Sequence, residues 1–229
     1  MKHIVFLIGL TFLINNLYSQ NCTCYYPESE TAKWQTETYL GKDAIKNCVN
    51  LYKVAGKASK EGVASYTIEN SCYNLDNTLR YTINYTMKCK ENIYYIDPKV
   101  LVDPLILQKY KDFDVNIIGD GIEMPKDLST GLDLSNVDFK VVISNRGTSV
   151  YNCTVKITSR EVAAIETIST TAGSFECYKI TYNLEIDSYI KTQLTVTDWY
   201  SKNTGLVKSE SKDLKKKLVS KTELKKFKE

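Results

Sequence analysis

The side chains that could do chemistry in this chain are seven cysteines, one histidine and two pairs of aspartates. The histidine, His3, lies within the first nineteen residues, which have the pattern of a cleavable leader. The mature chain would therefore contain no histidine. Without one, it cannot build a Ser-His-Asp or Cys-His nucleophile, a histidine general base or a histidine metal ligand.

The cysteines are spaced as structural thiols. The sequence contains no C-x-x-C motif of the kind found in thioredoxin-type sites and zinc ribbons. In an exported chain most cysteines should pair, although seven is an odd number. A hairpin centred near Lys60 would place Cys48 opposite Cys72, and such a disulfide would add about 3 kcal/mol of stability.

Cys177 lies near the start of the alternating stretch "AGSFECYKITYNLEID", residues 172–187. One face of the expected strand is apolar and includes Tyr178 and Ile180, whereas Cys177 lies near the start of the other, more polar face. In an exported chain without histidine, we interpret Cys177 as half of a disulfide and not as a nucleophile. The disulfide candidates are Cys48, Cys72, Cys89 and Cys177.

Two carboxylate pairs leave a hydrolase open as the least favoured hypothesis. Asp112 and Asp114 flank Phe113, and Asp133 and Asp138 lie in an expected loop region. Two carboxylates can cleave a glycoside without histidine, but nothing in the sequence fixes their separation or burial. The aspartates also lack the spacing of a calcium loop. We therefore expect that the protein is not an enzyme and that it holds neither a metal ion nor a cofactor.

The N-terminus predicts export. Lys2 and His3 precede an apolar run from Ile4 to Ile14, which is shorter than the ~20 residues that span a bilayer. Leu17 and Ser19 suit a cut before Gln20, so residues 1–19 are expected to be a signal peptide. No later apolar run is long enough for a membrane helix. We expect residues 20–229 to form one domain at the periplasm or cell surface of a Gram-negative bacterium, or to be secreted.

Most of the mature chain predicts antiparallel strands. Thr78 to Lys88, for example, is rich in Tyr, Thr and Ile. The exception is 98–111, where Asp97-Pro98 and Asp103-Pro104 each offer a helix N-cap followed by proline. About eleven strands joined by short turns predict a mainly β fold, a curved antiparallel sheet or half-barrel with one short helical lid.

The order of several motifs resembles the TapB-like family of exported β-rich proteins of unknown function. The motifs are "CYYP" at 24–27, "MKCKENIYYID" at 87–97, "LQKYKDFDV" at 107–115, "MPKDLSTGLDL" at 124–134, "AGSFECYKITY" and "WYSKNTGLVKSE". Cys24, Cys89 and Cys177 take the family's cysteine positions, whereas Cys22, Cys48, Cys72 and Cys153 are additional. The segment 28–30 departs from the family pattern. By analogy, the resemblance implies a lipoprotein-carrier type of half-barrel with the 98–111 helix over its concave face.

Three functional hypotheses remain at this point. The first is an exported, non-catalytic protein that carries a hydrophobic ligand, with a lining drawn from Tyr94, Leu101, Leu105, Ile106 and Tyr178. The second is an assembly factor that contacts an envelope protein through its sheet edges or its basic C-terminus. That segment holds ten lysines against four acidic residues from Lys202 onward and has no arginine, so we expect no nucleic-acid partner. The third is the carboxylate hydrolase.

Overall fold

The computed structural model describes residues 25–229. The expected signal peptide, Cys22 and Cys24 lie outside the described residues. The strands form one curved antiparallel sheet, as the sequence predicts, but they number thirteen where about eleven were expected. Their order in the sheet is β6-β8-β9-β10-β11-β12-β13-β1-β2-β3-β4-β5-β7. The strands are β1 (Lys33–Leu40), β2 (Ile45–Lys60), β3 (Val63–Tyr73), β4 (Leu79–Lys90), β5 (Ile93–Ile96), β6 (Asp114–Gly119), β7 (Ile122–Pro125), β8 (Val137–Asn145), β9 (Thr148–Thr170), β10 (Gly173–Asp187), β11 (Lys191–Ser201), β12 (Gly205–Lys212) and β13 (Leu218–Lys228).

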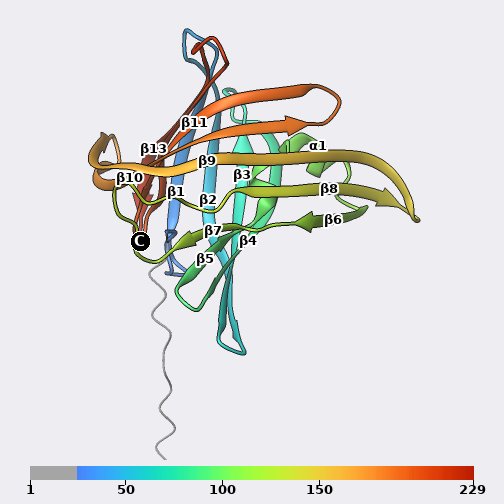
Figure 1. The fold of residues 1–229 in the computed structure, drawn as a ribbon, viewed down its shortest axis with the longest axis horizontal. Helices are drawn as coiled ribbons and strands as arrows, with labels where there is room; N and C mark the ends of the chain where they lie inside the picture. The colour runs from blue at the N-terminus through green and yellow to red at the C-terminus, as the bar shows by residue number, and fades with distance from the viewer. Residues whose placement is uncertain (1–24) are drawn as a thin grey trace, which may run out of the picture.

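The sheet curls so that its two halves cross. In Figure 1, β8 to β11 run roughly from side to side, whereas β1 to β4 run roughly from top to bottom. Side chains from both halves fill the space between them, and the core includes Ile68, Met87, Phe139, Val155 and Ile180. The alternation of side chains along each strand explains which residues are buried. In β4, every second residue from Tyr81 to Cys89 is buried, because successive side chains of a strand point to opposite faces.

Two short helical segments lie between β5 and β6, within the region where the sequence predicts them. They are η1 (Pro98–Leu101) and α1 (Pro104–Lys109). Asp97 and Asp103 cap them, each accepting a backbone hydrogen bond two residues on, at 3.0 and 2.9 Å. Asp97 also accepts from the Thr86 backbone N at 2.8 Å, which fastens η1 to β4. In the described part of the chain, no helix is long and apolar enough to cross a membrane.

The basic C-terminal segment is built into the sheet. β13 lies between β12 and β1, so the final strand pairs with the first along its whole length. Leu224 on its inner side is fully buried. Six of the ten lysines from Lys202 onward therefore lie on β12 and β13, and the other four, Lys202 and Lys215 to Lys217, lie in the adjoining turns.

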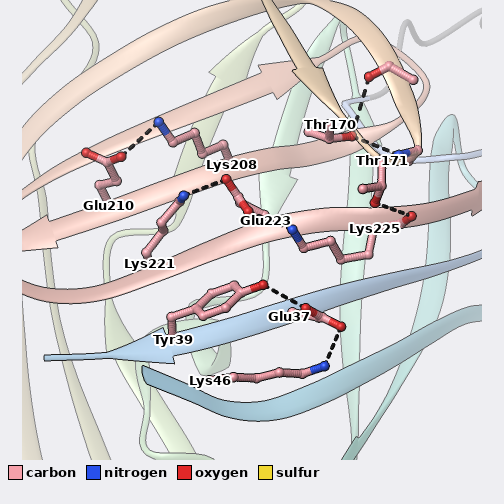
Figure 2. Close-up of polar contacts among 12 residues, drawn as sticks. Glu37, Tyr39, Lys46, Thr170, Thr171, Lys208, Glu210, Lys221, Glu223 and Lys225 are labelled. Atoms are coloured by element: carbon pink, nitrogen blue, oxygen red, sulfur yellow. Dashed lines mark hydrogen bonds and ion pairs between the residues drawn. The ribbon is translucent and has the colours of Figure 1, made fainter. Parts of the chain in front are cut away.

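The outer face of these strands carries a ladder of ion pairs, shown in Figure 2. Lys46 meets Glu37 at 2.6 Å, and Tyr39 donates to the same carboxylate at 2.7 Å. On β13, Glu223 lies 2.6 Å from Lys221 and 2.7 Å from Lys225. The ladder continues on β12, where Glu210 pairs with Lys208 and Lys212 at 2.8 and 3.8 Å. Each of these carboxylates thus has a cationic partner on the protein itself.

The hairpin of β2 and β3 corrects the expectation that Cys48 lies directly opposite Cys72, although the two side chains still interact with each other. It turns at Glu61 and Gly62, and a bulge between Val54 and Gly56 shifts the register. Cys72 therefore pairs with Asn50, and Cys48 lies two residues further along the same face. Cys48, Cys72, Cys153 and Cys177 are buried free thiols, whereas Cys89 is disulfide-bonded.

Candidate ligand-binding cavity

A cavity of about 240 Å³ lies between the two halves of the curved sheet. Its apolar walls come from both halves and include Ile68 and Met87 on one side and Ile157 and Ile180 on the other. Val100 and Leu101 of η1 also line it, so the short helical segment forms part of its boundary. An apolar hollow with a few polar groups is the usual form of a small-molecule site.

Two opposite charges are buried at this cavity. Arg160 of β9 and Asp198 of β11 both belong to the lining, and only 5% and 7% of their surfaces are exposed. Asp198 accepts a hydrogen bond from the Tyr182 hydroxyl at 2.9 Å. Arg160 Nη1 donates to the backbone oxygen of Glu123 at 2.6 Å, which ties β9 to β7. A guanidinium has five donors, so Arg160 retains capacity for further acceptors.

Burial dominates the electrostatics of both charged groups. It raises the pKa of Asp198, although hydrogen bonds from Ser209 and Tyr182 and the charge of Arg160 act in the opposite direction. Burial likewise lowers the pKa of Arg160. In both residues the fold disfavours the charged form, because little water remains to solvate it.

Tyrosines provide the remaining polar surface. Tyr26, Tyr52, Tyr85, Tyr182 and Tyr200 all line the cavity. Burial raises the pKa of each of these phenols, so they stay protonated and can donate hydrogen bonds at neutral pH. Tyr26 precedes β1, Tyr52 and Tyr85 lie on β2 and β4, and Tyr182 and Tyr200 lie on β10 and β11.

The five lining residues predicted from the sequence fall in different places. Leu101 lines the cavity. Tyr94 is buried against Tyr25 and Tyr26, with ring centroids 6.5 and 5.9 Å apart. Tyr178 meets Tyr25 at 5.9 Å, and Ile106 packs on the core from α1. Leu105 is 49% exposed.

The two charged residues are absent from the sequence prediction, although the pattern contains a signal for each. Asp198 lies on the same strand face as Val196 and Tyr200, so it is a charged residue on an otherwise apolar face. Arg160 is one of three arginines in a chain that relies on lysine for positive charge. Arginine is the more suitable cation for a buried site, because its charge is delocalised and its donors form a planar fork.

The thiols and carboxylates considered from the sequence do not assemble into a catalytic group. Cys177 is fully buried, and burial raises the pKa of its thiol to about 12, which suppresses the nucleophilic thiolate. Asp112, Asp114, Asp133 and Asp138 are all exposed. Asp138 forms an ion pair with Lys156 at 3.5 Å. Asp133 forms an isolated antiparallel β-bridge, through its backbone, with Glu161 of β9. Nothing in these arrangements indicates catalysis.

The fold and cavity define a curved antiparallel half-barrel with an internal hollow. The chain belongs to the DUF3108-like family, whose model matches residues 29–224. That finding agrees with the resemblance to exported β-rich proteins of unknown function, while the narrower TapB-like identity stays a prediction. No curated protein is similar enough to this chain to count as a relative.

Two crystal structures share the fold. One is a protein from Bacteroides fragilis, inferred to be exported and described with a YmcC-like fold. It is 19% identical, with a TM-score of 0.73 over 91% of this chain and 100% of its own. The other, inferred to be a lipoprotein, is from Parabacteroides distasonis, with 23% identity, the same TM-score and the same coverage.

Proposed function

We propose that the protein is an exported, non-catalytic carrier that holds a small, mainly apolar molecule in its internal cavity. The observation that carries this proposal is the pair of Arg160 and Asp198, buried at the wall of an apolar hollow. Burying two charges is costly, and two such groups at one cavity are more often kept for binding than for stability.

The chemistry of the cavity wall defines the ligand class. Arg160 offers donors, Asp198 offers acceptor oxygens, and their formal charges cancel. A neutral polar group that both accepts and donates hydrogen bonds, such as an amide or a hydroxyl, matches this pair better than an anion or a cation does. The surrounding isoleucines and tyrosines suit an apolar body. The ligand would therefore be amphipathic and uncharged.

The size of the cavity adds a second condition. About 240 Å³ is slightly below the ~300–1,000 Å³ of typical small-molecule sites. The ligand is therefore small, or η1 moves outward to admit it. The Asp97 contact to Thr86 N at 2.8 Å and the Lys99 side-chain contact to Asn84 O at 3.4 Å hold η1 to β4, so an outward shift of η1 would break these contacts but no strand pairing.

Export to the cell envelope completes the proposal. The N-terminal leader supports it, as do the two structural relatives inferred to be an exported protein and a lipoprotein. A TapB-like protein would share this location. The rival hypothesis of an assembly factor would use the edge strands β6 and β7, or the exposed lysines of the turn 213–217, because the rest of the basic segment is built into the sheet.

Native mass spectrometry of the protein purified from its own envelope fraction tests the proposal. We expect a bound mass that is lost on denaturation. Leu101→Asp, which puts a charge on the cavity wall, should abolish the bound mass, while the exposed Leu105→Asp on α1 serves as the matched control and should retain it. A bare wild-type chain, or equal loading of both variants, would contradict the proposal.

A further inference from the structure

Exposed apolar side chains gather at one end of the sheet. Twelve large hydrophobic residues of the described chain are exposed, and eight of them lie in or beside four turns. These turns, here called the apolar rim, are residues 41–44, 74–78, 188–190 and 213–217. The eight residues are Leu40, Ile45, Leu75, Leu79, Tyr189, Ile190, Leu214 and Val219. The turns 61–62 and 202–204, at the other end of the same strands, contribute none of the twelve.

The antiparallel strand order places the four turns at the same end of their strands. The Gly41 backbone N donates to Val219 O at 2.8 Å, which joins the first turn to the last. Lys191 and Gln193, just after the third turn, line a surface hollow together with Leu214. In Figure 1, the blue turn between β1 and β2 and the red turn between β12 and β13 project together at the top of the view. The turns 41–44 and 213–217 therefore adjoin, whereas the turn between β10 and β11 projects separately at the right of the view.

The apolar side chains stand at the tips of the rim. Tyr189, Ile190 and Leu214 are 75%, 77% and 74% exposed. Single exposed leucines are common on protein surfaces, but a concentration of them on neighbouring turns is not. Separate projecting side chains also differ from a groove, which would suit a helix or strand of a protein partner.

The charges around these tips favour an anionic surface. Segments 40–46, 74–80, 187–191 and 212–219 contain eight basic and four acidic residues. Three of the basic residues, Lys46, Lys191 and Lys212, are paired with Glu37, Glu185 and Glu210 outside these segments, so the positive charge is concentrated on the lysines of turns 41–44 and 213–217. Two of the acids are occupied within their own turns. Asp213 accepts from the Lys215 and Lys217 backbone N atoms at 2.9 Å each, and Asp76 accepts from Thr78 N at 3.0 Å. The side chains of Lys42, Lys215, Lys216 and Lys217 remain exposed.

We propose that the apolar rim docks this protein onto the surface of a bilayer that contains anionic phospholipid. The projecting apolar side chains would enter the boundary between headgroups and acyl chains, and the lysines would contact the lipid phosphates. Such an attachment is peripheral and reversible, because only a few side chains leave the water. It does not depend on what the internal cavity holds.

Vesicle co-sedimentation of the full mature chain tests this proposal. The probes are vesicles of phosphatidylcholine mixed with phosphatidylglycerol, and vesicles of phosphatidylcholine alone. We expect the wild-type protein to sediment with the mixed vesicles, to bind phosphatidylcholine more weakly, and to lose affinity as salt is added. Failure to sediment with the mixed vesicles would overturn the proposal and would indicate a protein partner for the rim.

Matched variants separate the rim from general stickiness. Ile190→Ser/Leu214→Ser should weaken binding about tenfold or more, whereas Leu105→Ser/Ile165→Ser, which changes two exposed residues away from the rim, should change it less than about twofold. Lys215→Glu should likewise weaken binding more than Lys60→Glu at the opposite turn. All four variants change exposed residues, so circular dichroism should show unchanged folding. Equal binding by the rim and control variants would overturn the proposal.

Discussion

The sheet carries charge on both of its faces, and the two faces use it differently. On the outer face, Glu37, Glu210 and Glu223 each have lysine partners within 2.6 to 2.8 Å. Inside, Arg160 and Asp198 are almost fully buried and interact mainly with a backbone oxygen and with neutral hydroxyls. Paired, half-solvated charges stabilise a sheet modestly, whereas desolvated charges at a cavity destabilise it unless a ligand compensates them.

The difference also appears in the direction of the pKa shifts. Burial alone would raise the pKa of Glu223, but hydrogen bonds from Lys221 and Lys225 lower it overall. Burial raises the pKa of Asp198, and its polar neighbours do not reverse that effect. Folding therefore favours the charged form of Glu223 and disfavours the charged form of Asp198. The outer ladder stabilises the fold. The inner pair destabilises the fold and is retained all the same.

The largest expected effect comes from removing the inner pair. Arg160→Met/Asp198→Asn keeps the approximate volumes and retains an acceptor for Tyr182. Since it removes two desolvated charges, we expect the free energy of unfolding of the ligand-free protein to rise by about 1–4 kcal/mol. Urea denaturation measures the change. A loss of stability of similar size would mean that the pair holds the fold together, and the contrast between the faces would fail.

The outer ladder should respond in the opposite direction. Glu223→Gln leaves Lys221 and Lys225 without their shared carboxylate, so the free energy of unfolding should fall by about 1 kcal/mol. Gln35→Glu on the neighbouring strand changes charge without breaking an ion pair and is a suitable control. If Glu223→Gln were as stabilising as the inner double variant, charge reduction alone would explain both results.

The pH dependence sharpens the same contrast. The folded pKa of Glu223 is lowered, so its stabilising contribution is present above the ordinary glutamate pKa of about 4.5 and is lost as pH falls. The folded pKa of Asp198 is raised above about 3.8, so its destabilising effect is present at neutral pH and disappears as pH falls through that raised value. At neutral pH, Glu223→Gln should have a lower free energy of unfolding than the wild-type protein, and Asp198→Asn a higher one. Both differences should shrink as the pH falls. Urea titrations at several pH values would show this.

The smallest expected effect is that of salt. Added salt should shrink the effect of Glu223→Gln, because the ladder is in contact with water. It should leave the effect of the inner double variant nearly unchanged, since its charges are shielded from the solvent. Equal salt sensitivity of the two variants would show that water reaches Arg160 and Asp198 freely.

Local pattern was sufficient to predict the strands and the helical segments. Alternating apolar residues define β4, β10 and β11, and the two Asp-Pro pairs define η1 and α1. The short strand β7 was missed, because four residues ending in Pro125 contain little pattern. The expectation that Cys48 lies directly opposite Cys72 was wrong by two residues, because the turn is centred on Glu61 and Gly62 and not on Lys60. The bulge between Val54 and Gly56 recovers only one residue of that difference.

The cavity could be predicted only in part. Leu101 was identified from its place on the expected helix, but Arg160 and Asp198 lie thirty-eight positions apart, on strands separated by β10. Their common position at the cavity wall depends on how far the sheet curls and on two bulges between β9 and β10. Such long-range features follow from the whole sheet. A charged residue on the apolar face of β11 was nevertheless visible as an exception, and exceptions of this kind mark functional positions.

The central claim is that the buried pair serves a ligand. Its most direct test is the native mass spectrum of Arg160→Met/Asp198→Asn, purified from the envelope fraction beside the wild-type protein. We predict a folded double variant that has lost the bound mass carried by the wild-type chain. A folded double variant that retains the same mass at the same occupancy would contradict the claim.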